Sequence, residues 1–116
     1  MPGDGLSATQ SAYLGGLVEN TAAYHTNIGV VNTGDEVATV LVELFAGTGN
    51  KLTDYPVTLN PGDWKQETQS FLNKAGRSNI DRGYAKITVQ SGSGVFAFAS
   101  VVDNTTNDPT TVTAQP

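Results

Sequence analysis

The amino-acid sequence predicts an all-β protein: a two-sheet immunoglobulin/fibronectin-like sandwich of about seven or eight antiparallel strands with one short helical turn. Gly, Pro, Asn and Asp recur about every ten residues, which is typical of short strands joined by turns. Between these turns apolar and polar residues alternate, and no long segment has the 3.6-residue period of a helix. A chain of 116 residues is large enough for one core, and two facing sheets bury their apolar faces against each other. A small barrel is the second architecture that fits.

The first part of the chain divides into a lead-in and the start of the domain. We expect residues 1–10, rich in Gly, Ser and Thr, to form a flexible lead-in, and residues 11–116 to form a single β-sandwich domain. Alternation predicts a half-buried strand from Tyr24 to Val31, a turn over residues 32–36, and a second strand from Val37 to Phe45.

The middle of the chain contains a strand with a proline inside it. Leu52 to Leu59 alternates, and Pro56 lacks a backbone donor, which predicts an edge strand or a bulge. Residues 60–63 predict a turn with Pro at its first central position and Gly at its second. A short strand is expected from Trp64 to Thr68.

The last third of the chain predicts one helical turn and three strands. Ser70 is expected to cap the turn and Gly76 to end it. Gly83 to Val89 alternates, Val95 to Val102 is apolar on both faces and therefore predicts a central strand, and Thr110 to Ala114 is prone to form a last strand.

Composition limits the classes of partner. Cysteine is absent, so disulfides and thiolate chemistry are excluded. Only 15% of the residues are charged, the net charge is −5, and the six basic residues form no stripe that could follow a phosphate backbone, which argues against nucleic acid. No apolar run approaches the roughly 20 residues that cross a bilayer, so we expect no membrane insertion. The polar, weakly charged surface favours a mature domain that is secreted or at the cell surface.

A search for catalytic groups gives no site. The single histidine, His25, lies in the middle of a predicted strand, and there is no Gly-x-Ser-x-Gly elbow. The acidic residues are scattered and mostly in turns, where carboxylates commonly accept backbone hydrogen bonds. A glycosidase pair is the one enzymatic alternative that this pattern leaves open. We therefore expect the chain not to be an enzyme.

One loop suggests a cation. Asp103, Asn104 and Asp108 follow the most apolar strand, and their oxygens are the ligand type that calcium prefers. The spacing lacks the Gly and the terminal Glu of an EF-hand, so a loop held by Asx turns is the favoured interpretation and a calcium site the alternative. Apart from calcium, no cofactor is expected.

The aromatic residues suggest a carbohydrate ligand. Trp64 and the tyrosines Tyr13, Tyr24, Tyr55 and Tyr84 could form a platform on which sugar rings stack, if they share one exposed face. Of these, Trp64, Tyr55 and Tyr84 are the expected ligand-binding residues. The alternative is that these rings pack in the core or at the ends of the sandwich.

Residues 24–115 also carry a pattern of turns and strand ends. Residues 28–36 read Ile-Gly-Val-Val-Asn-Thr-Gly-Asp-Glu, residues 57–62 read Val-Thr-Leu-Asn-Pro-Gly, and residues 100–109 read Ser-Val-Val-Asp-Asn-Thr-Thr-Asn-Asp-Pro. This pattern resembles bacterial extracellular immunoglobulin-like β-sandwich repeat modules, of which the adhesion-related CARDB-type modules are one example. The resemblance implies a surface adhesin part, a spacer or an appendage of a secreted enzyme, with no catalytic residues to transfer.

These observations predict a non-catalytic extracellular module with a structural, adhesive or spacer role in a larger secreted bacterial protein. Its expected partners are neighbouring domains of that protein or a surface glycan. Two alternatives stay open: a carbohydrate-binding module appended to a secreted enzyme, and a filament subunit that exchanges a strand donated by the N-terminal segment.

Overall fold

The computed structural model describes residues 5–20 and 23–114. Within them, the elements are β1 (Ser11–Asn20), β2 (Tyr24–Asn32), β3 (Ala38–Phe45), β4 (Lys51–Leu59), β5 (Trp64–Glu67), α1 (Ser70–Ala75), β6 (Asn79–Ser91), β7 (Val95–Asp103) and β8 (Pro109–Thr113). The pairs formed by these strands are antiparallel. The predicted all-β class, the number of strands and the single short helix are therefore confirmed.

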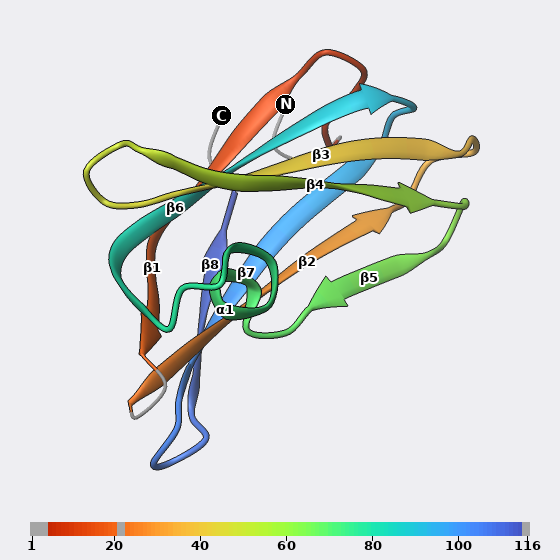
Figure 1. The fold of residues 1–116 in the computed structure, drawn as a ribbon. Coiled ribbons are helices and arrows are strands. Elements are labelled where there is room, and N and C mark those ends of the chain that lie inside the picture. Colours follow the sequence, from red (N-terminus) through yellow and green to blue (C-terminus); the bar gives the residue numbers. More distant parts are fainter. Residues whose placement is uncertain (1–4, 21–22, 115–116) are drawn as a thin grey trace.

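The strands form two layers that face each other (Figure 1). The first sheet has the order β4-β3-β6-β1 and the second the order β5-β2-β7-β8. In the described residues the two sheets are joined through one pair, Asn20 with Tyr24, where the chain passes from β1 to β2. This strand order differs from that of an immunoglobulin constant domain, so the likeness to that fold lies in the two-layer architecture.

The core lies between the layers and is built by strict alternation. In β3 the inward residues are Ala38, Val40, Val42 and Leu44, all of them buried, and their neighbours are partly exposed. In β7, Val95, Ala97 and Ala99 point inward. Phe96 and Phe98 lie on the opposite, outer face of the second sheet and are only partly buried. The face of β7 that belongs to the core, which the sequence pattern does not decide, is thus the face with the small residues.

Strand β1 is an element that the sequence pattern did not predict. Its inward residues Ala12 and Leu14 are followed by Leu17 and Glu19, so the alternation slips by one residue at Gly15–Gly16. The pairing with β6 shifts register at the same place, and Gly16 has a φ of 65°. This irregularity is a bulge, which bends the strand and hides its period of two.

The position of β4 agrees with its proline. Strand β4 is at the edge of the first sheet, with Pro56 opposite Leu41 of β3. The carbonyl oxygen of Thr58 accepts a 2.7 Å hydrogen bond from Lys65 Nζ on β5, so the backbone groups of Thr58 point away from β3. Every second residue of a strand directs its backbone groups to the same side, so those of Pro56 also point to the free edge. The N–H that Pro56 lacks would therefore form no hydrogen bond with β3.

Helix α1 lies where the sequence predicts it, but the predicted N-terminal cap is wrong. Gln69 is the N-cap residue, in the left-handed region with φ 46°, and Ser70 Oγ donates a 2.8 Å hydrogen bond to the Glu67 carbonyl. The predicted end at Gly76 is confirmed: it has φ 67°, and its N–H donates to the Leu72 carbonyl at 3.0 Å.

The described part of the expected lead-in, residues 5–10, is hydrogen-bonded to the domain. Leu6 exchanges backbone hydrogen bonds of 2.7 and 3.1 Å with Val95 at the start of β7. Ala8 and Thr9 donate to the carbonyls of Gly92 and Val89. Residues 1–4 lie outside the described residues.

Candidate functional site

The three aromatic residues predicted to form one platform lie in three different places. Trp64 is 61% exposed on edge strand β5. Tyr55 points inward from β4 and is only 8% exposed. Tyr84 lies on the outer face of the first sheet, since its chain neighbour Ala85 is buried in the core. The structure does not bring these rings together. Alternation within a strand tells which residues share a face of that strand, but it does not tell which sheet the strand joins.

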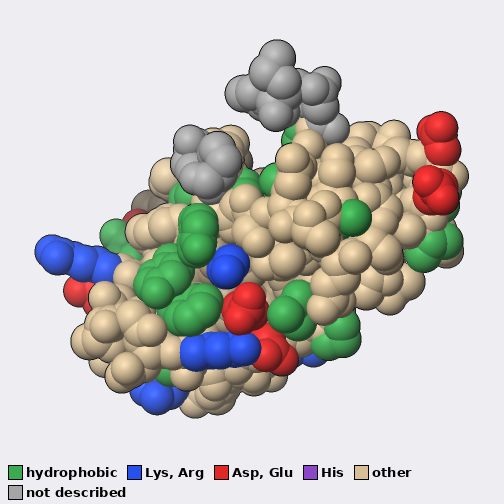
Figure 2. All heavy atoms as spheres, turned by 90° about the horizontal axis from the view of Figure 1, so that it is seen from above, with side chains coloured by type: hydrophobic (Ala, Val, Ile, Leu, Met, Phe, Trp, Pro, Cys, Tyr) green, Lys and Arg blue, Asp and Glu red, His purple; other side chains and the backbone are tan. Residues whose placement is uncertain are grey.

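Other residues do gather around Tyr84. Cross-strand pairing places Phe45 of β3 opposite Tyr84, and Tyr13 of β1 opposite Lys86, which is in turn opposite Glu43. Paired residues in neighbouring strands point to the same face, so all five side chains lie on the outer face of the first sheet. We call this group the aromatic strip. Figure 2 looks onto this side of the molecule and shows hydrophobic side chains clustered beside basic and acidic ones.

The rings of the aromatic strip contact one another. Tyr84 stacks on Phe45 with 4.7 Å between the ring centroids and 6° between the planes. Tyr13 lies 6.4 Å from Tyr84 at a tilt of 53° and is 42% exposed. Lys86 Nζ lies 6.0 Å from the centre of the Tyr13 ring. The strip therefore combines a partly exposed ring, Tyr13, with a cation that lies over it.

The polar end of the strip is fixed by an ion-pair network. Lys51 Nζ lies 3.1 Å from Glu43 Oε2 and 2.6 Å from Asp54 Oδ2. These two carboxylates raise the pKa of Lys51, with the hydrogen bond that Lys51 donates to Asp54 as the largest cause. Glu43 and Asp54 are opposite each other on β3 and β4, so the cation also relieves their mutual repulsion.

Trp64 belongs to an apolar area on the outer face of the second sheet. It is opposite Val31 of β2, which is opposite Phe96 of β7. In the next row the Phe98 ring covers Gly29, where a Cβ atom would lie 2.3 Å from Phe98 Cζ. The residues opposite Gly29 and Phe98 on the flanking strands, Gln66 and Thr113, are polar but uncharged, whereas the aromatic strip contains charged side chains.

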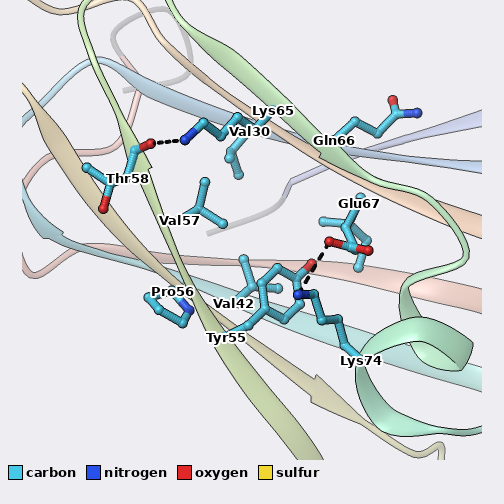
Figure 3. A pocket seen from close by; sticks show the side chains of 11 residues that line it. Val30, Val42, Tyr55, Pro56, Val57, Thr58, Lys65, Gln66, Glu67 and Lys74 are labelled. Atoms are coloured by element: carbon cyan, nitrogen blue, oxygen red, sulfur yellow. Dashed lines mark hydrogen bonds and ion pairs between the residues drawn. The ribbon is translucent and has the colours of Figure 1, made fainter.

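A cleft opens between the free edges of β4 and β5, and we call it the β4–β5 cleft. Its volume is about 370 Å³. It is lined by Ile28, Val30, Val42, Tyr55, Pro56, Val57, Thr58, Lys65, Gln66, Glu67 and Lys74. Figure 3 shows Tyr55 inside the cleft, with Lys74 and Glu67 at one end and Lys65 reaching across to Thr58.

The loop predicted to bind calcium is held by its own hydrogen bonds. Asp103 Oδ1 accepts a bond of 2.8 Å from the Thr105 N–H, which is the Asx turn of the favoured interpretation. Asn104 Oδ1 is hydrogen-bonded to Nδ1 of His25. Asp108 contributes backbone hydrogen bonds to Asp103 and to Thr106 Oγ1. No group of three or more His, Asp or Glu side chains suited to a metal occurs in the described residues, and the calcium site stays a prediction.

Glu19 is a buried carboxylate that the sequence places only among the scattered acidic candidates for a glycosidase pair. It is 1% exposed, and its Oε1 atom has no hydrogen-bond partner in the described residues. Burial raises the pKa of Glu19, and this outweighs the lowering by the backbone amides of Thr26, Phe71 and Leu72. Phe71 and Leu72 belong to the first turn of α1, so the carboxylate on β1 lies close to the start of the helix. The slipped alternation in β1 is the one sequence signal that could have placed Glu19 inside.

The fold and surfaces define the chain as an antiparallel β-sandwich domain with an aromatic surface on one sheet. Comparison with known proteins places it among solved structures with the same fold. A crystal structure of Thermotoga maritima protein 1070 is similar with a TM-score of 0.67 and 17% identity, over 96% of each chain. The Anabaena sensory rhodopsin transducer is similar with a TM-score of 0.54 and 14% identity, over 80% of this chain and 93% of that one. At these identities the likeness shows the fold alone.

No family model and no curated protein matches the sequence. In the described part of the chain, no helix has the length and apolar character to span a membrane.

Proposed function

We propose that this chain is a non-catalytic extracellular module of a larger secreted bacterial protein, and that it has an adhesive role in which the aromatic strip binds a surface glycan. The observation that carries the proposal is the strip itself. It offers the 42% exposed ring of Tyr13, the stacked pair Tyr84–Phe45, and the charged groups of Lys86 and Glu43 on the outer face of one sheet.

This combination suits a sugar because a pyranose ring has two kinds of surface. Its C–H face is apolar and packs on an aromatic face, while its hydroxyls need hydrogen-bond partners. Lys86 donates and Glu43 accepts, and hydrogen bonds to charged groups are the stronger kind. From β1 to β3 the strip spans two strand spacings, about 10 Å, which is enough for a short oligosaccharide.

The contacts of four carboxylates also support binding rather than catalysis. Glu43 and Asp54 share Lys51, and Glu67 pairs with Lys74 at 3.6 Å. Asp103 accepts hydrogen bonds from turn amides. Each of these groups has a structural partner that accounts for its position.

The test is affinity-gel retardation on a panel of soluble polysaccharides, preceded by a glycan-array screen. We expect Tyr13→Ala and Tyr84→Ala to weaken binding by roughly tenfold each, because a stacking ring contributes about 1 kcal/mol or more. Trp64→Ala is the matched control, since it removes an exposed ring from the other sheet and should leave migration unchanged.

Two results would contradict the proposal. One is full retardation of both tyrosine variants, and the other is loss of binding in Trp64→Ala alone, which would return the site to Trp64. The screen is run with calcium and with chelator, and binding that disappears with chelator would support a cation at the loop of Asp103 and Asp108.

A spacer or structural role is the second candidate, and the apolar area around Trp64 favours it. A 61% exposed Trp beside Val31 and Phe96 is the kind of residue that anchors protein contacts, here with a neighbouring domain. Strand exchange stays a prediction. The described part of its donor segment pairs with β7 of the same chain, and loss of assembly after deletion of residues 1–10 would support it.

A further inference from the structure

The β4–β5 cleft has an apolar floor and a polar entrance. Its floor consists of core residues of both sheets, with Ile28, Val30 and Val42 each at most 2% exposed. Its volume of about 370 Å³ is at the lower end of the range for small-molecule sites, about 300–1,000 Å³. The cleft exists because β5 pairs only with β2 and β4 only with β3 among the described strands, so the two edges diverge.

A buried hydroxyl without a partner marks one end of this cleft. Tyr55 is 8% exposed, and its hydroxyl has no hydrogen-bond partner in the described residues. Burial raises the pKa of Tyr55, the nearby Ser70 hydroxyl lowers it in part, and the negative charge of Glu67 raises it further, so the group is a neutral donor. A buried polar group that lacks a partner costs free energy, and a ligand that accepts this hydrogen bond would remove that cost.

The ion pair beside this hydroxyl is loose. Lys74 Nζ lies 5.1 Å from the centre of the Tyr55 ring and 3.6 Å from Glu67 Oε1. Both side chains are about one-third exposed, so their attraction is weak. Figure 3 shows the three groups converging at the same end of the cleft. A modest rotation of the long Lys74 side chain would open the hydroxyl to the cleft.

The charges at the entrance favour an anion. The lining includes two lysines, Lys65 and Lys74, and one acid, Glu67, which leaves one positive charge. The chain as a whole has six basic residues and a net charge of −5, so this is a local excess of positive charge on an acidic protein. Lys65 donates a 2.7 Å hydrogen bond to a backbone carbonyl, whereas the contact of Lys74 with Glu67 is longer, at 3.6 Å; Lys74 is therefore the cation that exchanges its partner for a ligand more easily.

We propose that the β4–β5 cleft binds a small organic acid, a monocarboxylate with a compact aromatic or branched apolar body. The carboxylate would accept hydrogen bonds from the Tyr55 hydroxyl and the Lys74 ammonium, while the apolar body packs on Val42 and Val57. This site is separate from the aromatic strip, which lies on the outer face of the first sheet, and neither proposal depends on the other.

The experiment uses phenylacetate as the probe and phenylacetamide as its neutral counterpart. Methyl and amide NMR spectra of the whole chain are recorded while each compound is added up to about 10 mM, a range that detects millimolar affinity. We expect phenylacetate to shift the methyl signals of Ile28, Val42 and Val57, and phenylacetamide to bind at least about tenfold more weakly.

Two variants test the polar contacts. Tyr55→Phe and Lys74→Gln should each weaken phenylacetate binding by about tenfold or more, as expected for a hydrogen bond to a charged group. Lys51→Gln is the matched control, because that lysine lies on the outer face of β3 and β4, and it should bind like the parent. Tyr55→Phe keeps the ring, so unaltered spectra and an unfolding midpoint at or above that of the parent would show that its fold is intact.

The proposal is overturned by any of three results. These are no change in the methyl signals of the cleft, equal binding of acid and amide, or unchanged affinity in Tyr55→Phe. Tyr13→Ala changes the aromatic strip and not the cleft, so it should leave phenylacetate binding unchanged. Failure of the glycan proposal and failure of the organic-acid proposal can therefore be distinguished.

Discussion

At the scale of single residues, Glu19 and Asn32 are buried polar groups with structural roles at different places. Glu19 faces the backbone amides that begin α1. Asn32 is fully buried, and its Nδ2 donates to the carbonyls of Glu36 and Leu59 at 2.7 and 3.1 Å. Its Oδ1 accepts from the Gly34 N–H at 2.9 Å. One amide side chain thus fixes two loops, which is a role that a turn signal in the sequence does not reveal.

Glu19 makes the stability of the domain depend on pH in a defined direction. Its pKa is raised in the folded state above the ordinary value of 4.5, so the folded state binds the proton more tightly than the unfolded state. The free energy of unfolding should therefore decrease as pH rises from about 4.5 through the raised pKa. Urea unfolding at several pH values measures this.

Glu19→Gln supplies the control for that measurement. The parent's free energy of unfolding minus that of the variant should be largest at acid pH, and this difference should decrease as pH rises. Other titrating groups are common to both proteins and cancel. A difference that is constant with pH would show that Glu19 does not titrate in this way.

At the scale of elements, α1 depends on how it ends. Gly76 has φ 67°, and apart from its chain neighbours no heavy atom lies within 4 Å of the place that a Cβ atom would take. A side chain there would therefore cause backbone strain and no clash. We expect Gly76→Ala to lower the free energy of unfolding by about 1 kcal/mol. Gly76→Asn should cost less, since Asn tolerates this conformation. Chemical denaturation checks the order, and an Ala variant as stable as the parent would contradict it.

The strands were predictable to the extent that their alternation was unbroken. Residues 38–45 alternate without a break, and the structure places a strand there. Residues 95–102 were predicted for another reason, their apolar character on both faces, and they also form a strand. β1 was missed because the Gly15–Gly16 bulge shifts its period. The candidate site was less predictable, because Trp64, Tyr55 and Tyr84 are assigned to different surfaces by long-range strand pairing. The contact between Tyr13 and Tyr84 depends on a register over about 70 residues, which local patterns do not contain.

At the scale of the whole molecule, the described ends of the chain meet along one strand. Thr113 of β8 is opposite Phe98 of β7, and Leu6 is opposite Val95 on the same strand. Three residues of β7 separate these positions, or about 10 Å. The N-terminal segment and β8 therefore act as two pieces of one interrupted edge strand.

A circular permutant tests this arrangement. Joining Ala114 to Gly5 with a short Gly/Ser linker and opening the chain in the exposed hairpin at Thr48–Gly49 should give a folded domain within about 2 kcal/mol of the parent. Opening the chain instead at Ile87, in the buried centre of β6, should abolish folding. Circular dichroism and urea unfolding of both proteins decide, and a permutant opened at the hairpin that fails to fold would contradict the arrangement.

The meeting of Leu6 and β8 has a mechanical consequence. Any polypeptide continuing beyond both ends would arrive and depart at nearly the same point, so the domain would add little to the contour length of its parent. The domain would project to the side of the main chain, with the outer faces of both sheets exposed. A force applied along such a protein would act mainly on the two end segments and little on the core of the domain. A domain attached in this way is better suited to holding a ligand than to separating its neighbours.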